Sequence, residues 1–115
     1  MITLYGIPNC SSVKKARDWL DQQGISYAFH DVKKLGIDQH TIAQWMKQVS
    51  WEILVNKKGT TWRGLTDAAR ASVTSAAGAT ALMIKHPSVI KRPVLCKDKT
   101  VLVGFDANTY EDHLA

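Results

Sequence analysis

The stretch that decides the fold is residues 2–29, ITLYGIPNCSSVKKARDWLDQQGISYAF. Apolar and polar side chains alternate over residues 2–6, which predicts a β-strand, and the sequence GIPN at residues 6–9 predicts a loop. A helix of about 13 residues then separates this strand from a second alternating segment over residues 25–29. Strand, helix and strand form a βαβ unit, so we expect two parallel strands joined by a right-handed crossover.

The helix of this unit carries start and stop signals. Ser11 and Ser12 are candidate N-caps, and Gly24 stands where a helix typically ends. The apolar residues that we expect on its buried side are Val13, Ala16 and Leu20, with Trp19 beside them.

From residue 38 to residue 86 the pattern becomes helical. Asp38 is a candidate N-cap for an amphipathic helix that carries apolar residues up to Val49. Residues 56–59 (NKKG) predict a loop. Two further helical stretches, residues 65–76 and 79–85, are expected on either side of Gly78. Trp51 and Trp62 of this region are candidates for either core residues or exposed aromatics.

The last part of the chain predicts a β-hairpin and a helix. The apolar runs 94–96 and 101–103 flank the polar sequence KDKT at residues 97–100. Asp106 can cap a final helix that runs to Leu114.

These elements predict an α/β protein with a thioredoxin-like four-stranded mixed sheet and a helical insertion between strands 2 and 3. We expect residues 1–115 to form a single domain, with βαβ at 1–35, the helical insertion at 38–86 and ββα at 90–115. Hydrophobic residues make up 45% of the chain and charged residues 22%, as in an ordinary globular domain. No signal peptide or apolar stretch of about 20 residues is evident, so a cytoplasmic location without a membrane partner is expected.

The two cysteines, Cys10 and Cys96, are expected to be reduced thiols in that compartment. Residue 13 is valine, so Cys10 does not form a C-x-x-C motif. The four histidines are scattered and none pairs with a cysteine at ligand spacing, so we expect no metal site. Cys96 is expected to be a buried strand residue rather than a resolving thiol, because free cysteine is among the most buried residue types.

Cys10 is the strongest candidate for a reactive group. It stands where the first strand passes into the first helix, and the unpaired N–H groups and dipole of a helix start stabilise a thiolate. Lys14 is four residues further along the same helix face and could add a positive charge near the sulfur. The alternative is an inert loop cysteine.

Two later segments are weaker candidates. Arg92 could hold an anion or could be solvated, and Pro93, at the entry to a strand, could be an ordinary trans proline or a special conformation. Gly104 permits close approach of a ligand, and N–H groups near Asp106 could bind a carboxylate; alternatively, these two residues simply make a turn and cap a helix.

Three sequence blocks carry a resemblance to a known family. Residues 5–16 (YGIPNCSSVKKA) resemble the active-site loop of the arsenate reductase-like (ArsC/Spx) family, and residues 90–95 (IKRPVL) and 102–105 (LVGF) are similar to its two later blocks. The resemblance covers essentially the whole chain and is greatest to the YffB branch.

The resemblance implies a thioredoxin fold in which Cys10 is the nucleophile, Arg92 binds an oxyanion and Pro93 is a cis-proline that faces the cysteine. It implies a glutathione-dependent monothiol reductase, with glutathione as co-substrate and no bound cofactor. Lys14 and Arg92 are expected to stabilise the thiolate and the glutathione carboxylates. The other expected substrate-binding or glutathione-binding residues are Asn9, Ser11, Ser12, Pro93, Gly104 and Asp106.

The resemblance leaves two alternatives open. A glutaredoxin-linked arsenate reductase would have further arginines, but Asn56 and the uncharged residues 101–104 stand at their expected positions. A regulatory protein-binding module like Spx, with RNA polymerase as a partner, often carries the C-x-x-C switch that Val13 removes. The net charge of +5 is spread along the chain without a nucleic-acid-binding motif, so nucleic acid is not expected as a partner.

Overall fold

The structure is a computed structural model that describes residues 1–114. Two compact units are formed, one by residues 1–35 together with the described residues from 92 onward, and the other by residues 36–91. Within the described residues, no helix is both long enough and apolar enough to cross a membrane.

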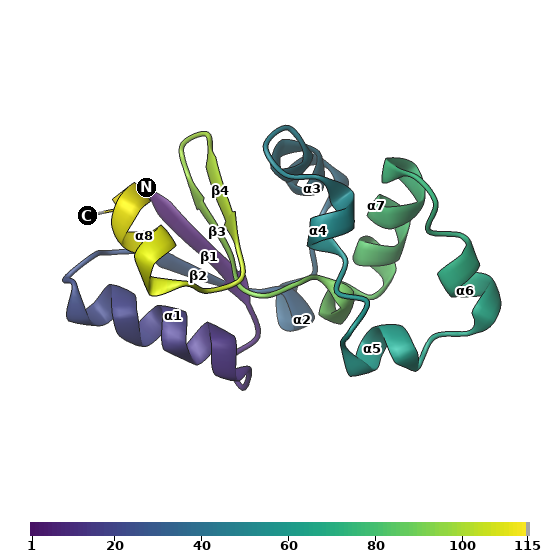
Figure 1. Cartoon of the computed structure of the whole chain (residues 1–115), viewed down its shortest axis with the longest axis horizontal. Helices are drawn as coiled ribbons and strands as arrows, with labels where there is room; N and C mark the ends of the chain where they lie inside the picture. The colour runs from purple at the N-terminus through teal and green to yellow at the C-terminus, as the bar shows by residue number, and fades with distance from the viewer. Residues whose placement is uncertain (115) are drawn as a thin grey trace. The chain divides into compact units, whose positions relative to one another are not determined.

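The first unit contains a four-stranded mixed sheet in the order β2-β1-β3-β4 (Figure 1). Its strands are β1 (Ile2–Gly6), β2 (Ala28–Asp31), β3 (Val94–Lys97) and β4 (Thr100–Val103). The β1–β2 pair is parallel, whereas β1–β3 and β3–β4 are antiparallel. This is the predicted thioredoxin-like arrangement, and it confirms the βαβ unit and the C-terminal hairpin.

Two helices cover one face of this sheet, α1 (Ser11–Gln22) and α8 (Ala107–Leu114). Leu4 and Leu95 of the sheet form a core with Leu20 of α1 and Tyr110 of α8, all fully buried. The expected face of α1 is confirmed, since its buried residues are Val13, Ala16 and Leu20. A short helix, α2 (Val32–Leu35), follows β2.

The end of α1 shows why β2 is shorter than predicted. Gly24 has a φ of 67°, its N–H donates to the Asp21 carbonyl at 3.1 Å, and the Ile25 N–H donates to the Leu20 carbonyl at 3.0 Å. These bonds form a Schellman motif, which ties residue 25 to the helix. Pairing with β1 therefore begins at Ala28 instead of Ile25, and the predicted strand 25–29 is wrong at its start.

The second unit is helical. It contains α3 (Gln39–Met46), α4 (Trp51–Leu54), α5 (Thr60–Arg63), α6 (Asp67–Ala71), α7 (Ala76–Lys85) and the 3₁₀ turn η1 (Pro87–Val89). Asp38 caps α3 as predicted, since its side chain accepts the Thr41 N–H at 2.8 Å. Trp45 and Ile42 of this helix are buried, whereas Val49 lies beyond its end. Trp51 and Trp62 are both half-buried, so neither is a pure core residue nor a fully exposed one.

The predicted helix boundary at Gly78 is wrong. Gly78 lies inside α7, whose N-cap Ser75 accepts the Gly78 N–H at 3.2 Å. A Cβ atom on Gly78 would lie 2.4 Å from the Ser72 carbonyl oxygen, so glycine is required by the close turn between α6 and α7. The break between α6 and α7 falls at residues 72–75, because Ser75 caps the start of α7.

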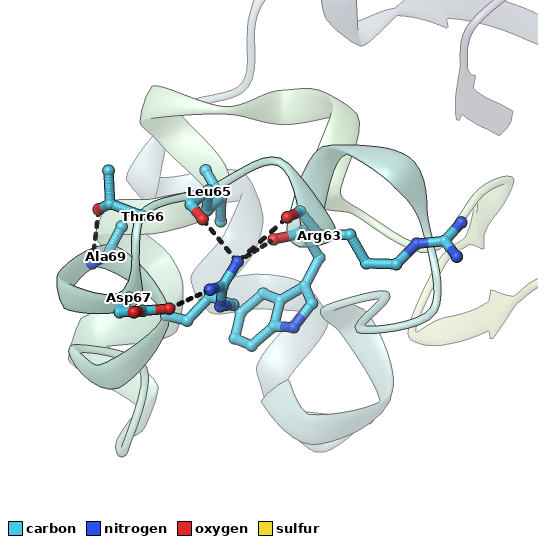
Figure 2. Close-up of polar contacts among 7 residues, drawn as sticks. Arg63, Leu65, Thr66, Asp67 and Ala69 are labelled. Atoms are coloured by element: carbon cyan, nitrogen blue, oxygen red, sulfur yellow. Dashed lines mark hydrogen bonds and ion pairs between the residues drawn. The ribbon is translucent and has the colours of Figure 1, made fainter.

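A single arginine holds the turn between α5 and α6. Arg70 donates through Nη1 to the carbonyls of Arg63 at 3.1 Å and Leu65 at 2.5 Å, and it forms an ion pair with Asp67 (Figure 2). Thr66 caps α6 by accepting the Ala69 N–H at 3.1 Å, also drawn in Figure 2. The guanidinium thus satisfies carbonyls that the turn would otherwise leave unpaired.

Candidate active site around Cys10

Cys10 is the N-cap residue of α1. Its backbone is extended, with φ −95° and ψ 129°, and its carbonyl accepts the Lys14 N–H at 2.9 Å, which begins the helix. Ser11 and Ser12, expected as caps, are instead the first two helical residues, so that prediction is wrong. The reason is that the turn in which the Cys10 N–H donates to the Ile7 carbonyl at 3.2 Å already places residue 10 in the capping conformation.

The start of α1 has no side-chain cap. Among the described residues, no side chain accepts a hydrogen bond from the first turn as a cap, and no acidic residue lies in that turn. The N–H groups of this turn therefore point outward unpaired by any cap, next to a half-buried thiol. The start of a helix with free N–H groups is a place where proteins commonly bind negatively charged groups.

Close packing positions this helix start against the sheet. A Cβ on Gly6 would lie 2.7 Å from Cγ2 of Val13, which is fully buried. Glycine at the end of β1 therefore lets the first turn of α1 approach the strand more closely than any other residue would. The loop that carries Cys10 is tied to the sheet by this contact.

The cis-proline segment lies at the same edge of the sheet. Tyr5 is opposite Val94 in the β1–β3 pair, so Pro93 comes next to the end of β1 from which the Cys10 loop departs. The Arg92–Pro93 peptide bond is cis, as the resemblance implies, and Pro93 is buried. The Gly104 N–H donates to the Pro93 carbonyl at 2.8 Å, which extends the β3–β4 pairing by one residue. The sheet therefore brings the Cys10 loop, Pro93 and Gly104 to one edge.

Arg92 carries a buried donor without an acceptor. Within residues 1–114, its Nε is buried and has no hydrogen-bond partner, and no carboxylate lies within ion-pair distance of its guanidinium. A buried, unpartnered polar atom is destabilising in a folded protein unless a ligand or water satisfies it. Arg92 therefore has a buried donor that an anion or a water molecule could satisfy.

Other predicted site residues are already engaged. Nζ of Lys14 pairs with Asp18 at 3.0 Å on the exposed surface, one turn further from Cys10, which partly neutralises its charge. Asp106 accepts the Asn108 N–H at 2.9 Å and so acts as a cap of α8. Because the Gly104 N–H is bound to Pro93, neither the Gly104 nor the Asn108 N–H is left for a ligand carboxylate. Gly104 has a φ of 78°, a conformation that disfavours any other residue.

The remaining predicted residues flank the thiol. Asn9 and Ser11 are exposed on either side of Cys10, and Ser12 is half-buried.

Within the described chain, no group of three or more His, Cys, Asp or Glu side chains is arranged to hold a metal ion. Sequence reasoning overlooked Arg17, whose guanidinium lies over the Phe29 ring of β2; the only sequence signal for it is its i,i+4 spacing to Asp21.

Cys96 lies away from this edge. It is half-buried on β3 opposite Thr3, whereas the Cys10 loop leaves the sheet after Gly6. Three residues of strand, about 10 Å, separate the register position of Cys96 from the end of β1, and both cysteines are free thiols. The expectation that Cys96 is a strand residue is confirmed, although it is half-buried rather than fully buried.

Comparisons with known proteins agree with this geometry. The ArsC family model matches residues 5–113. A solved structure of a YffB protein superposes with a TM-score of 0.95 at 43% identity and covers all of both chains. An arsenate reductase (ArsC) related protein from Brucella melitensis is 48% identical, with a TM-score of 0.74, and the match covers 97% of this chain and 92% of that one.

The curated relatives include an uncharacterized protein and a transcriptional regulator. An uncharacterized protein from Haemophilus influenzae is 39% identical over 111 residues, with 96% of each chain covered. The global transcriptional regulator Spx of Bacillus subtilis is 24% identical over 108 residues, which are 92% of this chain and 81% of that protein. The cysteine at the uncapped helix start, the cis-proline and the matched family model lead to one conclusion: this chain belongs to the ArsC family.

Proposed function

We propose that the protein is a glutathione-linked monothiol reductase in which Cys10 is the attacking group. The observation that carries the proposal is the position of Cys10 as the N-cap of α1, half-buried, beside N–H groups that no side chain caps. A thiolate is the nucleophile in thiol–disulfide exchange, and the N–H groups at a helix start can donate hydrogen bonds to a negatively charged reaction partner. Membership of a family that includes proteins related to arsenate reductase supports thiol-based chemistry.

The reaction follows from a single thiol. The Cys10 thiolate attacks the glutathione sulfur of a mixed disulfide between glutathione and a substrate thiol, and a Cys10–glutathione disulfide forms. The substrate sulfur leaves as a thiolate and takes a proton from water. A second glutathione thiolate then attacks the glutathione sulfur of this bond, which releases Cys10 and oxidised glutathione. Overall, the mixed disulfide and one glutathione thiol become the free substrate thiol and oxidised glutathione, so the second glutathione is the reductant. Cys96 takes no part, because its strand position is too remote from the Cys10 loop.

Arg92 is proposed to bind a glutathione carboxylate. Its buried Nε lacks an acceptor in the described chain, and a charge-assisted hydrogen bond to a carboxylate would supply one. The carboxylate is assigned to Arg92 because the Gly104 N–H is already bound to Pro93. Asn9, Ser11 and Ser12 are proposed to line the bound tripeptide around the thiol. Lys14 can join them only if its ion pair with Asp18 opens.

The test is glutathione-dependent reduction of 2-hydroxyethyl disulfide, followed through oxidised glutathione. We expect turnover by the wild type, no turnover by Cys10→Ser and unchanged turnover by the matched control Cys96→Ser. Mass spectrometry of a trapped intermediate should show one glutathione on Cys10. Equal loss of activity in both serine variants, or activity retained in Cys10→Ser, would contradict the monothiol scheme.

Arsenate reduction is the second candidate, favoured by the similarity to the Brucella melitensis protein. It needs stabilisation of a multiply charged oxyanion, but β4 (Thr100–Val103) offers no cation and Asn56 stands where an arginine is expected. An assay with arsenate, glutathione and glutaredoxin separates the two reactions: arsenite formation that depends on Cys10 would establish arsenate as a substrate.

A regulatory role is the third candidate, suggested by the similarity to Spx. Its proposed partner is RNA polymerase, and its test is retention of polymerase subunits by the immobilised protein. Alkylation of Cys10 at neutral pH, mapped by mass spectrometry, distinguishes the candidates first. Faster modification of Cys10 than of Cys96 supports a reductase, whereas an inert Cys10 together with polymerase binding supports the regulator.

A further inference from the structure

A second polar feature of the first unit lies on α1, away from Cys10. Arg17 is half-buried, its guanidinium carbon lies 4.3 Å from the centroid of the Phe29 ring, and its Nε donates to the Tyr27 hydroxyl at 3.2 Å. These two contacts restrain the side chain. Within residues 1–114, the two terminal nitrogens of Arg17 have no hydrogen-bond acceptor and no ion pair.

Asp21 lies one helical turn further along, where it could pair with Arg17. An i,i+4 pair of opposite charges usually stabilises a helix, as the neighbouring pair Lys14–Asp18 does at 3.0 Å. In the described part of the chain, however, Asp21 forms no ion pair, because Arg17 is held over Phe29 instead. The contacts of Arg17 with Phe29 of β2 (Ala28–Asp31) and with Tyr27 just before this strand thus keep it from pairing with Asp21.

Both charges line one open pocket. Its volume is about 560 Å³, within the range of about 300–1,000 Å³ typical of small-molecule sites. The lining residues are Arg17, Asp21, Gly24, Ile25, Ser26, Tyr27 and Phe29. The pocket therefore combines a cation, an anion and an apolar wall, and the end of α1 with the Schellman turn gives it a fixed backbone.

We propose that this pocket binds a small zwitterion of the α-amino acid type. The ligand carboxylate accepts from the terminal nitrogens of Arg17, and the ligand ammonium donates to Asp21. Ile25 and Tyr27 provide an apolar surface for the ligand side chain. A simple anion would be repelled by Asp21 and a simple cation by Arg17, so a ligand with both charges fits best.

This site is distinct from the proposed reductase site. Arg17 is seven residues after Cys10, which corresponds to about 10 Å along a helix at 1.5 Å per residue. Binding here involves neither the thiol nor Arg92. Ligand binding in this pocket can therefore be tested independently of the activity of Cys10.

The test is a titration of the ¹⁵N-labelled protein with L-phenylalanine, read from amide chemical shifts. We expect saturable shifts confined to residues 17–29. Two matched probes each lack one charge: 3-phenylpropanoate has no ammonium, and 2-phenylethylamine has no carboxylate. Each should bind at least about tenfold more weakly, since a hydrogen bond to a charged group contributes about 1.5–3 kcal/mol.

Variants assign the two charges. Arg17→Gln and Asp21→Asn should each weaken phenylalanine binding about tenfold or more, whereas Lys15→Gln on the exposed surface of the same helix is the control and should not. Asp21 is exposed, so Asp21→Asn retains the fold even if Arg17→Gln does not. No saturable shift at millimolar phenylalanine, equal affinity for 3-phenylpropanoate, or unchanged affinity in Asp21→Asn would each overturn the proposal.

Discussion

The contact between Gly6 and Val13 offers a quantitative test of how β1 positions the Cys10 loop. In Gly6→Ala, the new methyl group would lie 2.7 Å from Cγ2 and 3.1 Å from Cγ1 of Val13. Val13 cannot easily turn away, because a β-branched side chain in a helix has one preferred rotamer and this one is fully buried. The first turn of α1 must therefore move away from the strand.

The expected magnitude comes from two opposing effects. Overpacking a buried contact costs about 1–3 kcal/mol. Replacing glycine where its φ is not positive stabilises by about 0.4–1 kcal/mol through the unfolded chain. We therefore expect Gly6→Ala to lower the free energy of unfolding by about 1 kcal/mol, or the Tm by about 4 °C for a domain of this size.

Urea denaturation of a double-mutant cycle identifies the cause. Val13→Ala removes two buried methyl groups and should cost about 2 kcal/mol. In Gly6→Ala/Val13→Ala the alanine at position 6 occupies space that Val13 has left, so the double variant should be more stable than the sum of the single effects predicts, by about 1 kcal/mol or more. Additive effects, or a Gly6→Ala variant as stable as the wild type, would refute the close approach of strand and helix.

Three further outcomes are expected. Arg70→Ala should destabilise the second unit by about 1–2 kcal/mol, because the carbonyls of Trp62, Arg63 and Leu65 lose their donor, and hydrogen exchange at Leu65 should accelerate more than at Ala79 of α7. Asp106→Ala should cost about 1 kcal/mol in thermal denaturation, whereas Asp106→Asn should retain the α8 cap. Burial raises the pKa of Tyr110 above its ordinary value, so the neutral form is favoured in the folded state. The resulting contribution to the free energy of unfolding is complete below about pH 10. At higher pH it is lost, and the free energy of unfolding should fall by up to about 1.4 kcal/mol per pH unit. Tyr110→Phe should lack this extra fall, and an equal fall in both proteins would contradict the prediction.

Local sequence signals predicted the βαβ unit, the helical insertion and the ββα part in the correct order, but not the short helices α2, α4 and α5. Alternation over residues 2–6, the spacing of Val13, Ala16 and Leu20, and the capping aspartates at 38 and 106 each act within a few residues. Such signals depend only on the period of the element and on nearby N–H groups, so they can be recognised without knowledge of the fold. They also placed Cys10 at a helix start, which is the central feature of the candidate site.

The errors occurred where a local signal competed with a bond that the sequence does not display. Ile25 shares the alternating pattern of a strand, but its N–H is used by the end of α1. Gly78 resembles a helix breaker, but it is the small residue that α7 needs beside the Ser72 carbonyl. Ser11 and Ser12 are good caps by residue type, but the turn at residues 7–10 makes Cys10 the cap.

By itself, the sequence determined which residues of α1 face the core, which residue caps α3, and that a lone thiol stands at the start of the first helix. Only the tertiary structure decided which polar groups remain without partners: Nε of Arg92 is buried with no acceptor in the described chain, while the Gly104 N–H is bound to the Pro93 carbonyl. It also separated Arg17 from Asp21 by placing Phe29 under the guanidinium. The physical reason is that capping and amphipathic spacing are properties of neighbouring residues, whereas satisfaction of a buried charge depends on strand register and packing between distant segments.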